Sequence, residues 1–397
     1  MTRPTVIITD GDQRAALAVV RSLGKKYRCV VTASWPSSLA GGSRFSSRSE
    51  VVPDALERPG DFADAIVALA EREHAAVVLP ITEPAMLAIL GVRSRLAPAV
   101  VPFPDLSTFK ALTDKQRLLE EASKLGILVP PQVIVQSRIA AASMDFNALH
   151  YPVVLKPSRT VSDNGEGRTK LSVSYAADEI DLQRRIRLLP AAAFPLLLQR
   201  RVTGPGMGIF LLLWDGEQRA QFAHRRLCEK PPSGGVSVYC ESVAMDEDLR
   251  DRSRALLDRF GWRGVAMVEY KRDAVTGQYY LMEVNGRFWG SLQLAIDAGV
   301  DFPRLLVASA LGERTEPQVT YRVGVRSRWW WGQVDHLIGR VPRRERTGSL
   351  PPGTVTARRA LADLLLAPFR RGDREEVLSW GDPRPFLNET IRWMSAL

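Results

Sequence analysis

Short apolar runs alternate with helical patterns along the N-terminal part of the chain. Residues 5–9 (TVIIT), 27–34 and 75–82 are predicted strands, because each is a brief apolar run of strand length. Residues 12–24 and 61–74 space their apolar side chains as amphipathic helices do. Since strands alternate with helices, we expect a parallel sheet that is covered by helices.

A proline-rich stretch, VPFP at residues 101–104, marks the predicted start of a second unit. Thr113 or Asp114 can cap a helix that runs to about Leu125, and Gly126 is placed to end it. This helix is expected to begin the second unit.

Strand patterns dominate the middle of the chain. A strand is predicted at residues 151–158, and a polar loop follows at 158–168. Residues 194–227 read as a strand, a turn and two further strands joined by the turn sequence DGE. Residues 262–291 are predicted to form a β-hairpin with VTGQ in its turn. The chain is therefore assigned to the α/β and α+β classes.

This order of elements predicts three units. They are an N-terminal domain at residues 1–105, a second domain at 106–315 with a smaller subdomain at about 150–215, and a basic, partly helical C-terminal extension at 316–397. Within the extension, residues 343–354 are expected to be a mobile loop and residues 357–370 a helical segment.

Composition excludes several classes of protein. Hydrophobic residues make up 45% of the chain, which is ordinary for a folded globular protein. No apolar run reaches the roughly eighteen residues that a membrane-spanning helix needs, and the N-terminus does not resemble a signal peptide. The cysteines lack CxxC spacing and the histidines form no ligand pair, so neither a disulfide framework nor a zinc site is expected. We expect a cytoplasmic protein.

The net charge of +10 is distributed unevenly along the chain. Residues 321–397 hold 14 arginines against 8 acidic residues. Such a surplus can mark a nucleic-acid or membrane surface, but no compact basic repeat or nucleic-acid motif accompanies it. We favour a solvated basic surface and expect no nucleic-acid partner.

The stretch LMEVNGRFWGS, residues 281–291, places polar side chains in a strand that reads as buried. Glu283, Asn285 and Arg287 share one face, because alternate residues of a strand point the same way. Glu269 on the neighbouring strand can face Glu283 across the hairpin. Carboxylate and amide oxygens suit one or two Mg²⁺ or Mn²⁺ ions that also bind phosphate, whereas an ordinary Glu–Arg ion pair is the alternative interpretation.

The order of several short blocks resembles that of the ATP-grasp superfamily. The blocks are TDK at 113–115, VVLKP at 153–157, the hinge strand at 196–204 and VE…MEVNGR, within a span of about Val6 to Leu311. The pattern is similar to the branch that includes biotin carboxylase and the large chain of carbamoyl-phosphate synthetase. The resemblance implies an ATP-grasp fold with a Rossmann-like N-terminal domain, a small lid domain and a mixed-sheet ATP-grasp domain, followed here by a helical C-terminal extension.

The resemblance also implies roles for the polar strand residues. Glu269 and Glu283 correspond to the two metal-binding glutamates of the family, Asn285 to the metal-binding asparagine, and Arg287 to the active-site arginine. Gly286 stands where relatives commonly have proline, which is expected to loosen the turn but removes no ligand.

Nucleotide-binding positions are implied on the lid side. Lys115 corresponds to a lysine near the α-phosphate, and Lys156 to one at the adenine and phosphate end that is also counted as catalytic. The hinge departs from the family, because the sequence QRR replaces an acidic pattern. The other implied nucleotide contacts are Ser158, Gln199, Arg201 and Val202.

A basic strand and loop, residues 224–235, is implied to bind the substrate carboxylate and its acyl phosphate. The implied residues are His224, Arg225, Arg226, Ser233 and Gly234. A charged lid face with a glycine turn explains the same sequence equally well.

Two acidic residues and a run of tryptophans complete the candidates. Asp10 and Glu83 follow predicted strands at the place where open α/β sheets usually bind ligands, although helix capping is the simpler role for each. The three consecutive tryptophans at 329–331 are assigned to core packing in preference to a subunit, membrane or substrate contact.

The function that the resemblance implies is ATP-dependent ligation. A small carboxylate, such as an amino acid, is activated as an acyl phosphate and coupled to an amine, with release of ADP and phosphate. A carboxylase or carbamoyl-phosphate-type enzyme is disfavoured, because the chain has neither a tandem duplication nor an evident biotin-carrier segment. A non-catalytic ATP-binding module is the alternative that the altered hinge supports. A homodimer is one option for the assembly.

Overall fold

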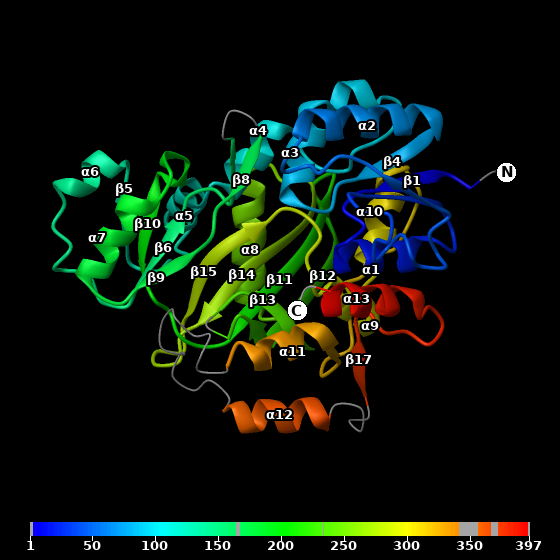
Figure 1. Ribbon diagram of the computed structural model, residues 1–397. Coiled ribbons are helices and arrows are strands. Elements are labelled where there is room, and N and C mark those ends of the chain that lie inside the picture. The colour runs from blue at the N-terminus through cyan, green and yellow to red at the C-terminus, as the bar shows by residue number, and fades with distance from the viewer. Residues whose placement is uncertain (1–2, 164–166, 233, 341–355, 367–371, 396–397) are drawn as a thin grey trace.

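The elements group into four sheets and their covering helices (Figure 1). The structure, a computed structural model, describes residues 3–163, 167–232, 234–340, 356–366 and 372–395. The predicted loop at 343–354 lies outside these residues.

The N-terminal part is a parallel sheet with helices packed on it, as the alternation of patterns predicts. Its four strands lie in the order β3-β2-β1-β4, and all three pairings are parallel. Its elements are β1 (Thr5–Ile8), α1 (Arg14–Leu23), β2 (Arg28–Ala33), β3 (Arg48–Val51), α2 (Pro59–Arg72), β4 (Ala75–Leu79), α3 (Glu83–Gly91) and the 3-10 helix η1 (Arg93–Leu96).

Two helices, α4 (Leu106–Thr113) and α5 (Lys115–Lys124), lead into the second part of the chain. Asp114 caps α5, because its side chain accepts a hydrogen bond from the backbone N–H of Arg117. Gly126 follows the helix with a φ of +71°, a conformation that suits glycine. The predicted cap and end of this helix are therefore confirmed.

The lid is a smaller body with its own hydrophobic core. Its sheet has the order β5-β10-β6-β9, and a separate hairpin pairs β7 with β8. Its elements are β5 (Gln132–Val135), α6 (Arg138–Ala142), β6 (Val153–Pro157), β7 (Val161–Asp163), β8 (Arg168–Lys170), β9 (Ser174–Ala176), α7 (Glu179–Leu188), η2 (Ala191–Ala193) and β10 (Leu196–Arg200). This sheet thus draws its strands from residues 132–200, and β11 pairs within a different sheet.

The large sheet carries the order β15-β14-β11-β12-β13-β16-β17. Its pairings are antiparallel except for the parallel pair β16 and β17, so the sheet is mixed, as expected. The turn between β11 and β12 has positive φ at Asp215 and Gly216, which matches a tight hairpin. Its elements are β11 (Gly206–Trp214), β12 (Glu217–Lys230), β13 (Val236–Ser242), α8 (Glu247–Arg259), β14 (Gly264–Arg272), β15 (Tyr279–Asn285), α9 (Leu292–Ala298) and α10 (Phe302–Ala310).

The C-terminal extension adds both helices and strands to this body. Figure 1 places α13 beside α1 of the N-terminal sheet, and β16 and β17 extend the large sheet. Trp331 stacks on Trp393 of α13 with ring centroids 4.1 Å apart, so this tryptophan packs within the chain. The elements are β16 (Arg326–Arg328), α11 (Trp330–Ile338), α12 (Ala357–Leu365), β17 (Asp373–Glu375) and α13 (Arg384–Ser395).

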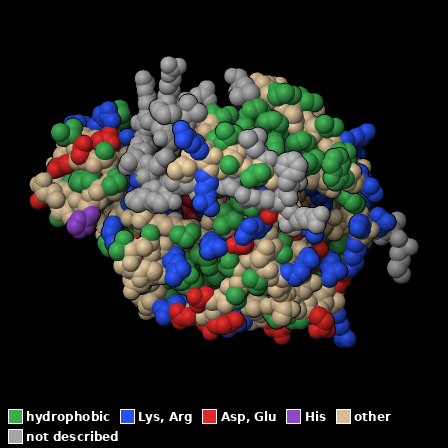
Figure 2. All heavy atoms as spheres, turned by 90° about the horizontal axis from the view of Figure 1, so that it is seen from below, with side chains coloured by type: hydrophobic (Ala, Val, Ile, Leu, Met, Phe, Trp, Pro, Cys, Tyr) green, Lys and Arg blue, Asp and Glu red, His purple; other side chains and the backbone are tan. Residues whose placement is uncertain are grey.

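The surface charge and the lengths of the helices bear on the expected partners. Figure 2 shows one face on which Lys and Arg side chains are interspersed with Asp and Glu. In the described part of the chain, no helix is both long and apolar enough to span a bilayer.

Candidate active site

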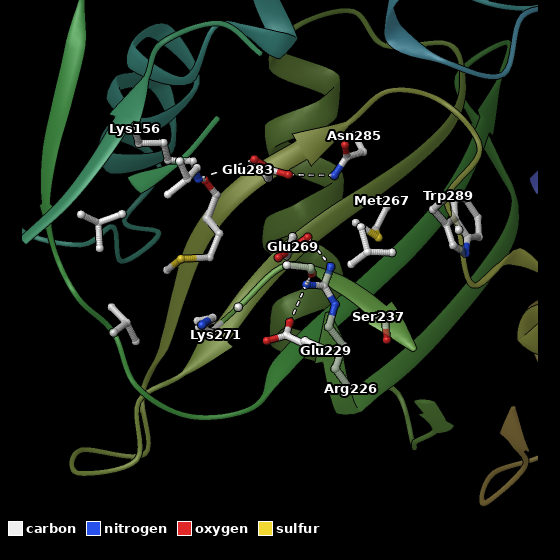
Figure 3. Close-up of a pocket in the computed structure, with 18 of the residues that line it drawn as sticks. Lys156, Arg226, Glu229, Ser237, Met267, Glu269, Lys271, Glu283, Asn285 and Trp289 are labelled. Carbon is white, nitrogen blue, oxygen red and sulfur yellow. Dashed lines mark hydrogen bonds and ion pairs between the residues drawn. The ribbon is translucent and has the colours of Figure 1, made fainter. Parts of the chain in front are cut away.

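A cleft of about 370 Å³ lies where the lid, the large sheet and the N-terminal domain meet. The lid contributes Lys156 and Gln199 to its lining, and β14 and β15 contribute Glu269 and Glu283. Figure 3 shows these two carboxylates and Asn285 along the same sheet surface. The tertiary fold therefore gathers residues from distant parts of the sequence into one polar cleft.

The register of β14 and β15 places Glu269 directly opposite Glu283, as the hairpin pattern predicts. Asn285 lies two residues further along β15, and its amide donates to Glu283 over 3.2 Å. Arg287 donates to the Asn285 side-chain oxygen over 3.3 Å and to the Phe288 carbonyl over 2.8 Å. Glu283, Asn285 and Arg287 line the cleft together with Glu269, so the predicted polar face exists as a face of this cleft.

The surroundings shift the pKa values of the two glutamates in opposite directions. Burial acts to raise the pKa of Glu283, but the ammonium groups of Lys156 and Lys115 outweigh it and hold the pKa at about 2. Burial raises the pKa of Glu269, although the guanidinium of Arg226 opposes that rise. Glu283 is therefore ionised at neutral pH, and the charge on Glu269 depends on its ion pair with Arg226.

Lys156 is the predicted lysine that enters the cleft. Its Nζ donates to the Met282 carbonyl over 2.8 Å and lies 3.6 Å from a Glu283 oxygen. Burial lowers the pKa of Lys156, while the charge on Glu283 counteracts this effect. The ammonium group of Lys156 thus connects the lid to β15, the strand that carries Glu283.

Lys115 and Ser158 lie behind the cleft and do not line it. Lys115 donates to the Thr160 hydroxyl over 2.8 Å, and Ser158 donates to Asp114 over 2.6 Å. These contacts attach the start of α5 to the end of β6. The charge of Lys115 still reaches the cleft, because it helps to lower the pKa of Glu283.

The predicted hinge residues Gln199, Arg201 and Val202 all line the cleft. The Gln199 amide donates to Gln132 over 2.7 Å within the lid sheet. The Arg201 guanidinium lies 4.9 Å from the ring centroid of Tyr175. The hinge therefore presents a cationic group, which lies over an aromatic ring of β9, at the position where the family pattern is acidic.

The predicted substrate strand divides between two faces of the sheet. Arg226 and Gly234 line the cleft, and Arg226 forms ion pairs with Glu269 and Glu229. Arg225 points to the other face, where it lines a separate groove and pairs with Glu241 over 2.7 Å. Because neighbouring residues of a strand alternate in direction, Arg225 does not share the cleft with Arg226. Ser233 lies outside the described residues.

His224 faces the same side as Arg226 but lies deeper, in an aromatic core. It packs edge-on against Phe210 at 4.7 Å and its Nδ1 lies 3.3 Å from the Ser291 hydroxyl. Burial lowers its pKa well below the usual value. His224 does not line the cleft, so it supports the wall and does not reach a ligand there.

The two acidic candidates of the N-terminal domain differ. Asp10 accepts hydrogen bonds from Ile81 and Thr82 across the sheet end, so it links two loops and caps neither helix. Glu83 begins α3 after the Thr82 cap. Burial raises the pKa of Glu83, and the charges of Lys115 and Arg287 oppose that rise.

Several cleft residues were missed by sequence reasoning. Trp289, Gly290 and Ser291 directly follow Arg287, so their position in the motif was a usable signal. Arg14 and Lys271 had no such signal. Arg14 comes from the first helix of the N-terminal domain, where its position reads only as part of an amphipathic pattern.

The donor set of the cleft is composed of oxygen ligands. In the described part of the chain, no group of three or more His, Cys, Asp or Glu side chains is arranged to hold a metal ion. Glu269, Glu283 and Asn285 offer two carboxylates and one amide, which is a hard donor set of the kind that Mg²⁺ accepts alongside phosphate oxygens.

Comparison with known proteins identifies relatives for this arrangement. Residues 193–331 match a family described as "ATP-grasp in the biosynthetic pathway with Ter operon". The chain is 22% identical over 245 residues to a D-aspartate ligase of Enterococcus faecium, covering 59% of this chain and 58% of that protein. It is 24% identical over 198 residues to the alpha subunit of a mitochondrial methylcrotonoyl-CoA carboxylase of Oryza sativa, covering 46% of this chain and 26% of that protein. The chain thus spans about half and about a quarter of these two relatives.

Solved structures share the fold at low sequence identity. An L-amino acid ligase from Bacillus licheniformis aligns with a TM-score of 0.61 and 17% identity, covering 78% of this chain and 75% of that one. A biotin carboxylase complex from Campylobacter jejuni aligns with a TM-score of 0.64 and 15% identity, covering 82% of this chain and 74% of that one. Residues 193–331 thus match an ATP-grasp family, and the fold shared with the solved structures agrees with the order of the motifs.

Proposed function

We propose that the chain is an ATP-dependent ligase that activates a small carboxylate as an acyl phosphate and couples it to an amine. The observation that carries this proposal is the convergence of Glu269, Glu283, Asn285 and Arg287 on the cleft that also holds Lys156. The names of two relatives, a D-aspartate ligase and an L-amino acid ligase, support an amino acid as one substrate.

The charges that line the cleft favour anionic substrates. Three glutamates are outnumbered by seven cationic side chains, namely Arg14, Lys156, Arg200, Arg201, Arg226, Lys271 and Arg287. A concave surface with an excess of one charge concentrates ligands of the opposite charge. ATP and a carboxylate are both such ligands.

We propose that Glu269, Glu283 and Asn285 would hold Mg²⁺, or Mn²⁺, with two ions as the expected number. A bound divalent ion would neutralise charge on the phosphates. Glu283 is already ionised and therefore ready to bind a cation, while Glu269 would share its carboxylate with Arg226.

The proposed reaction has two steps, and Arg287 can assist both. A carboxylate oxygen of the substrate attacks the γ-phosphorus of ATP, and the bond to ADP breaks. The amine then attacks the carbonyl carbon of the acyl phosphate, loses a proton and expels phosphate. Arg287 has N–H groups left after its bonds to Asn285 and Phe288, and these can stabilise negative charge on the reacting oxygens in both steps.

An assay of acceptor-dependent ADP release tests the proposal. The protein is incubated with ATP, Mg²⁺ and pairs of amino acids, and the products are analysed for ADP and for a new amide by mass spectrometry. We expect Arg287→Met to lower turnover by about 100- to 1,000-fold, because it removes an oxyanion-stabilising group. Glu217→Gln is the matched control, since Glu217 is exposed at the β11–β12 turn of the same sheet.

Two results would contradict ligase activity, and a third would contradict the role of Arg287. ATP binding without acceptor-dependent ADP release would indicate a non-catalytic module. ADP release that requires bicarbonate and yields no amide would indicate a carboxylase. Unchanged turnover in Arg287→Met would remove the assigned role of that residue.

A further inference from the structure

Arg14 is a residue of the N-terminal domain that lines the cleft. It is the first residue of α1, and its side chain is only 9% exposed. Ser237 and Trp289, which line the same part of the cleft, lie across from Lys156 in Figure 3. Arg14 therefore reaches the cleft away from the lid lysine, near the residues that directly follow Arg287.

The guanidinium of Arg14 is held on three sides. Nη1 forms an ion pair with Glu376, and Nη2 donates to the Ser237 carbonyl over 3.1 Å. The guanidinium carbon lies 4.1 Å from the ring centroid of Trp329. A Cβ at Gly290 would stand 2.9 Å from Nη2, so the absent side chain at position 290 makes room for the arginine.

These contacts leave Arg14 with N–H groups that are available to a ligand in the cleft. An arginine has five N–H groups, and the described residues accept hydrogen bonds from only two of its nitrogen atoms here. The fork geometry matches a carboxylate. Because Arg14 already shares its charge with Glu376, a monoanion fits this position better than a phosphate dianion.

We propose that Arg14 binds the carboxylate of the acceptor, and that the acceptor amine therefore belongs to an amino acid. The inference rests on the proposed ligase function and names its second substrate class. In this assignment Arg287 contacts the carboxylate of the first substrate, which is activated. Arg14 binds the carboxylate of the acceptor, which does not react. The partners that position Arg14, Glu376 and Trp329, both come from the C-terminal extension, which gives that extension a role in substrate selection.

The test compares free amino acids with their C-terminal amides as acceptors. The amides keep the attacking amine and lack the carboxylate. We expect the wild-type protein to prefer the free acids by about ten- to a hundredfold in kcat/KM, the usual effect of a charge-assisted hydrogen bond. In Arg14→Gln this preference falls to about one, the acceptor KM rises, and the KM for ATP is unchanged.

Arg21→Gln is the matched control. Arg21 lies on the same helix and also bonds to the C-terminal extension, with Nε 3.0 Å from Asp382, but it does not line the cleft. It should keep the acid preference. Gly290→Ala is a second variant, because its Cβ would push the flexible end of Arg14 aside without removing a charge. It should reduce the preference as Arg14→Gln does, even if that variant folds poorly.

The outcomes separate the two proposals. Amide formation by the wild type without a preference for free acids overturns the Arg14 inference and leaves the ligase function intact. An equal loss of preference in Arg14→Gln and Arg21→Gln also overturns the inference, because it assigns the effect to docking of the extension. No amide with either set of acceptors overturns both.

Discussion

At Gly286, the ring of Trp262 occupies the space that a side chain would need. A Cβ at this position would stand 2.3 Å from the Trp262 Cη2 atom, far inside contact distance. The sequence comparison with the family pattern reads Gly286 as a looser turn. The structure instead shows a close approach of backbone and ring, directly between Asn285 and Arg287.

Gly286→Ala is expected to destabilise the fold by about 1–3 kcal/mol, because a methyl group cannot fit without moving Trp262 or the backbone. The backbone shift would also displace Arg287 and lower acceptor-dependent ADP release. Urea denaturation and the turnover assay measure the two effects. Gly91→Ala is the control, since a Cβ there meets no atom within 4 Å. Equal stability of both variants would contradict the packing argument.

At the scale of elements, two adjacent glutamates lie at the end of β17, the edge strand of the large sheet: Glu375 is its last residue, and Glu376 follows it. Burial, assisted by the neighbouring Glu376, raises the pKa of Glu375 to about 8 against the opposing charge of Arg328. Burial also raises the pKa of Glu376 to about 7, although Arg14 opposes that rise. The end of β17 thus holds two acids whose pKa values are raised to near neutrality.

The raised pKa of Glu375 predicts that the protein becomes less stable to unfolding as the pH rises. Between the ordinary pKa of 4.5 and the folded value of about 8, the folded chain keeps a proton on Glu375 that the unfolded chain has lost. The free energy of unfolding should therefore decrease from pH 5.5 to pH 8.5. Glu375→Gln, which mimics the protonated acid, should show a weaker decrease in urea denaturation over this range. Glu217→Gln should follow the wild-type curve, and a Glu375→Gln curve parallel to it would contradict the assignment.

At the scale of the whole molecule, Asp382 of the extension is bound by the N-terminal domain. Its carboxylate accepts hydrogen bonds from Ser43 over 2.7 Å, from the Arg44 backbone over 2.9 Å and from Arg21 over 3.0 Å. The Asp382 side chain is 2% exposed. Chain segments far apart in sequence are thus joined by one buried acid.

Asp382→Ala should destabilise the protein by about 3–5 kcal/mol, because the largely buried guanidinium of Arg21 would lose its ion-pair partner. Asp64→Ala is the matched control. It breaks the exposed pair of Asp64 with Arg95 and should change stability by less than about 1 kcal/mol. Thermal or chemical denaturation of both variants checks the difference, and similar small effects would show that the extension docks by other contacts.

Local patterns in the sequence determine much of this protein's fold independently of tertiary contacts. The alternation of apolar runs predicted the parallel N-terminal sheet, and the cap at Asp114 predicted α5. The polar residues of β15 predicted that Glu269 and Glu283 face each other. These inferences succeed because strand period, helix capping and hairpin register depend on neighbours in the sequence.

Other features were decided only by the tertiary structure. Arg14 reaches the cleft because the N-terminal domain and the extension meet over it, and nothing in its local sequence marks that contact. His224 lies in the wall and Arg225 lies on the far face, although both belong to the same basic run as Arg226. The sequence shows that these residues form one charged run. Which of them can contact a ligand depends on their burial and on the direction of each side chain in the assembled sheet.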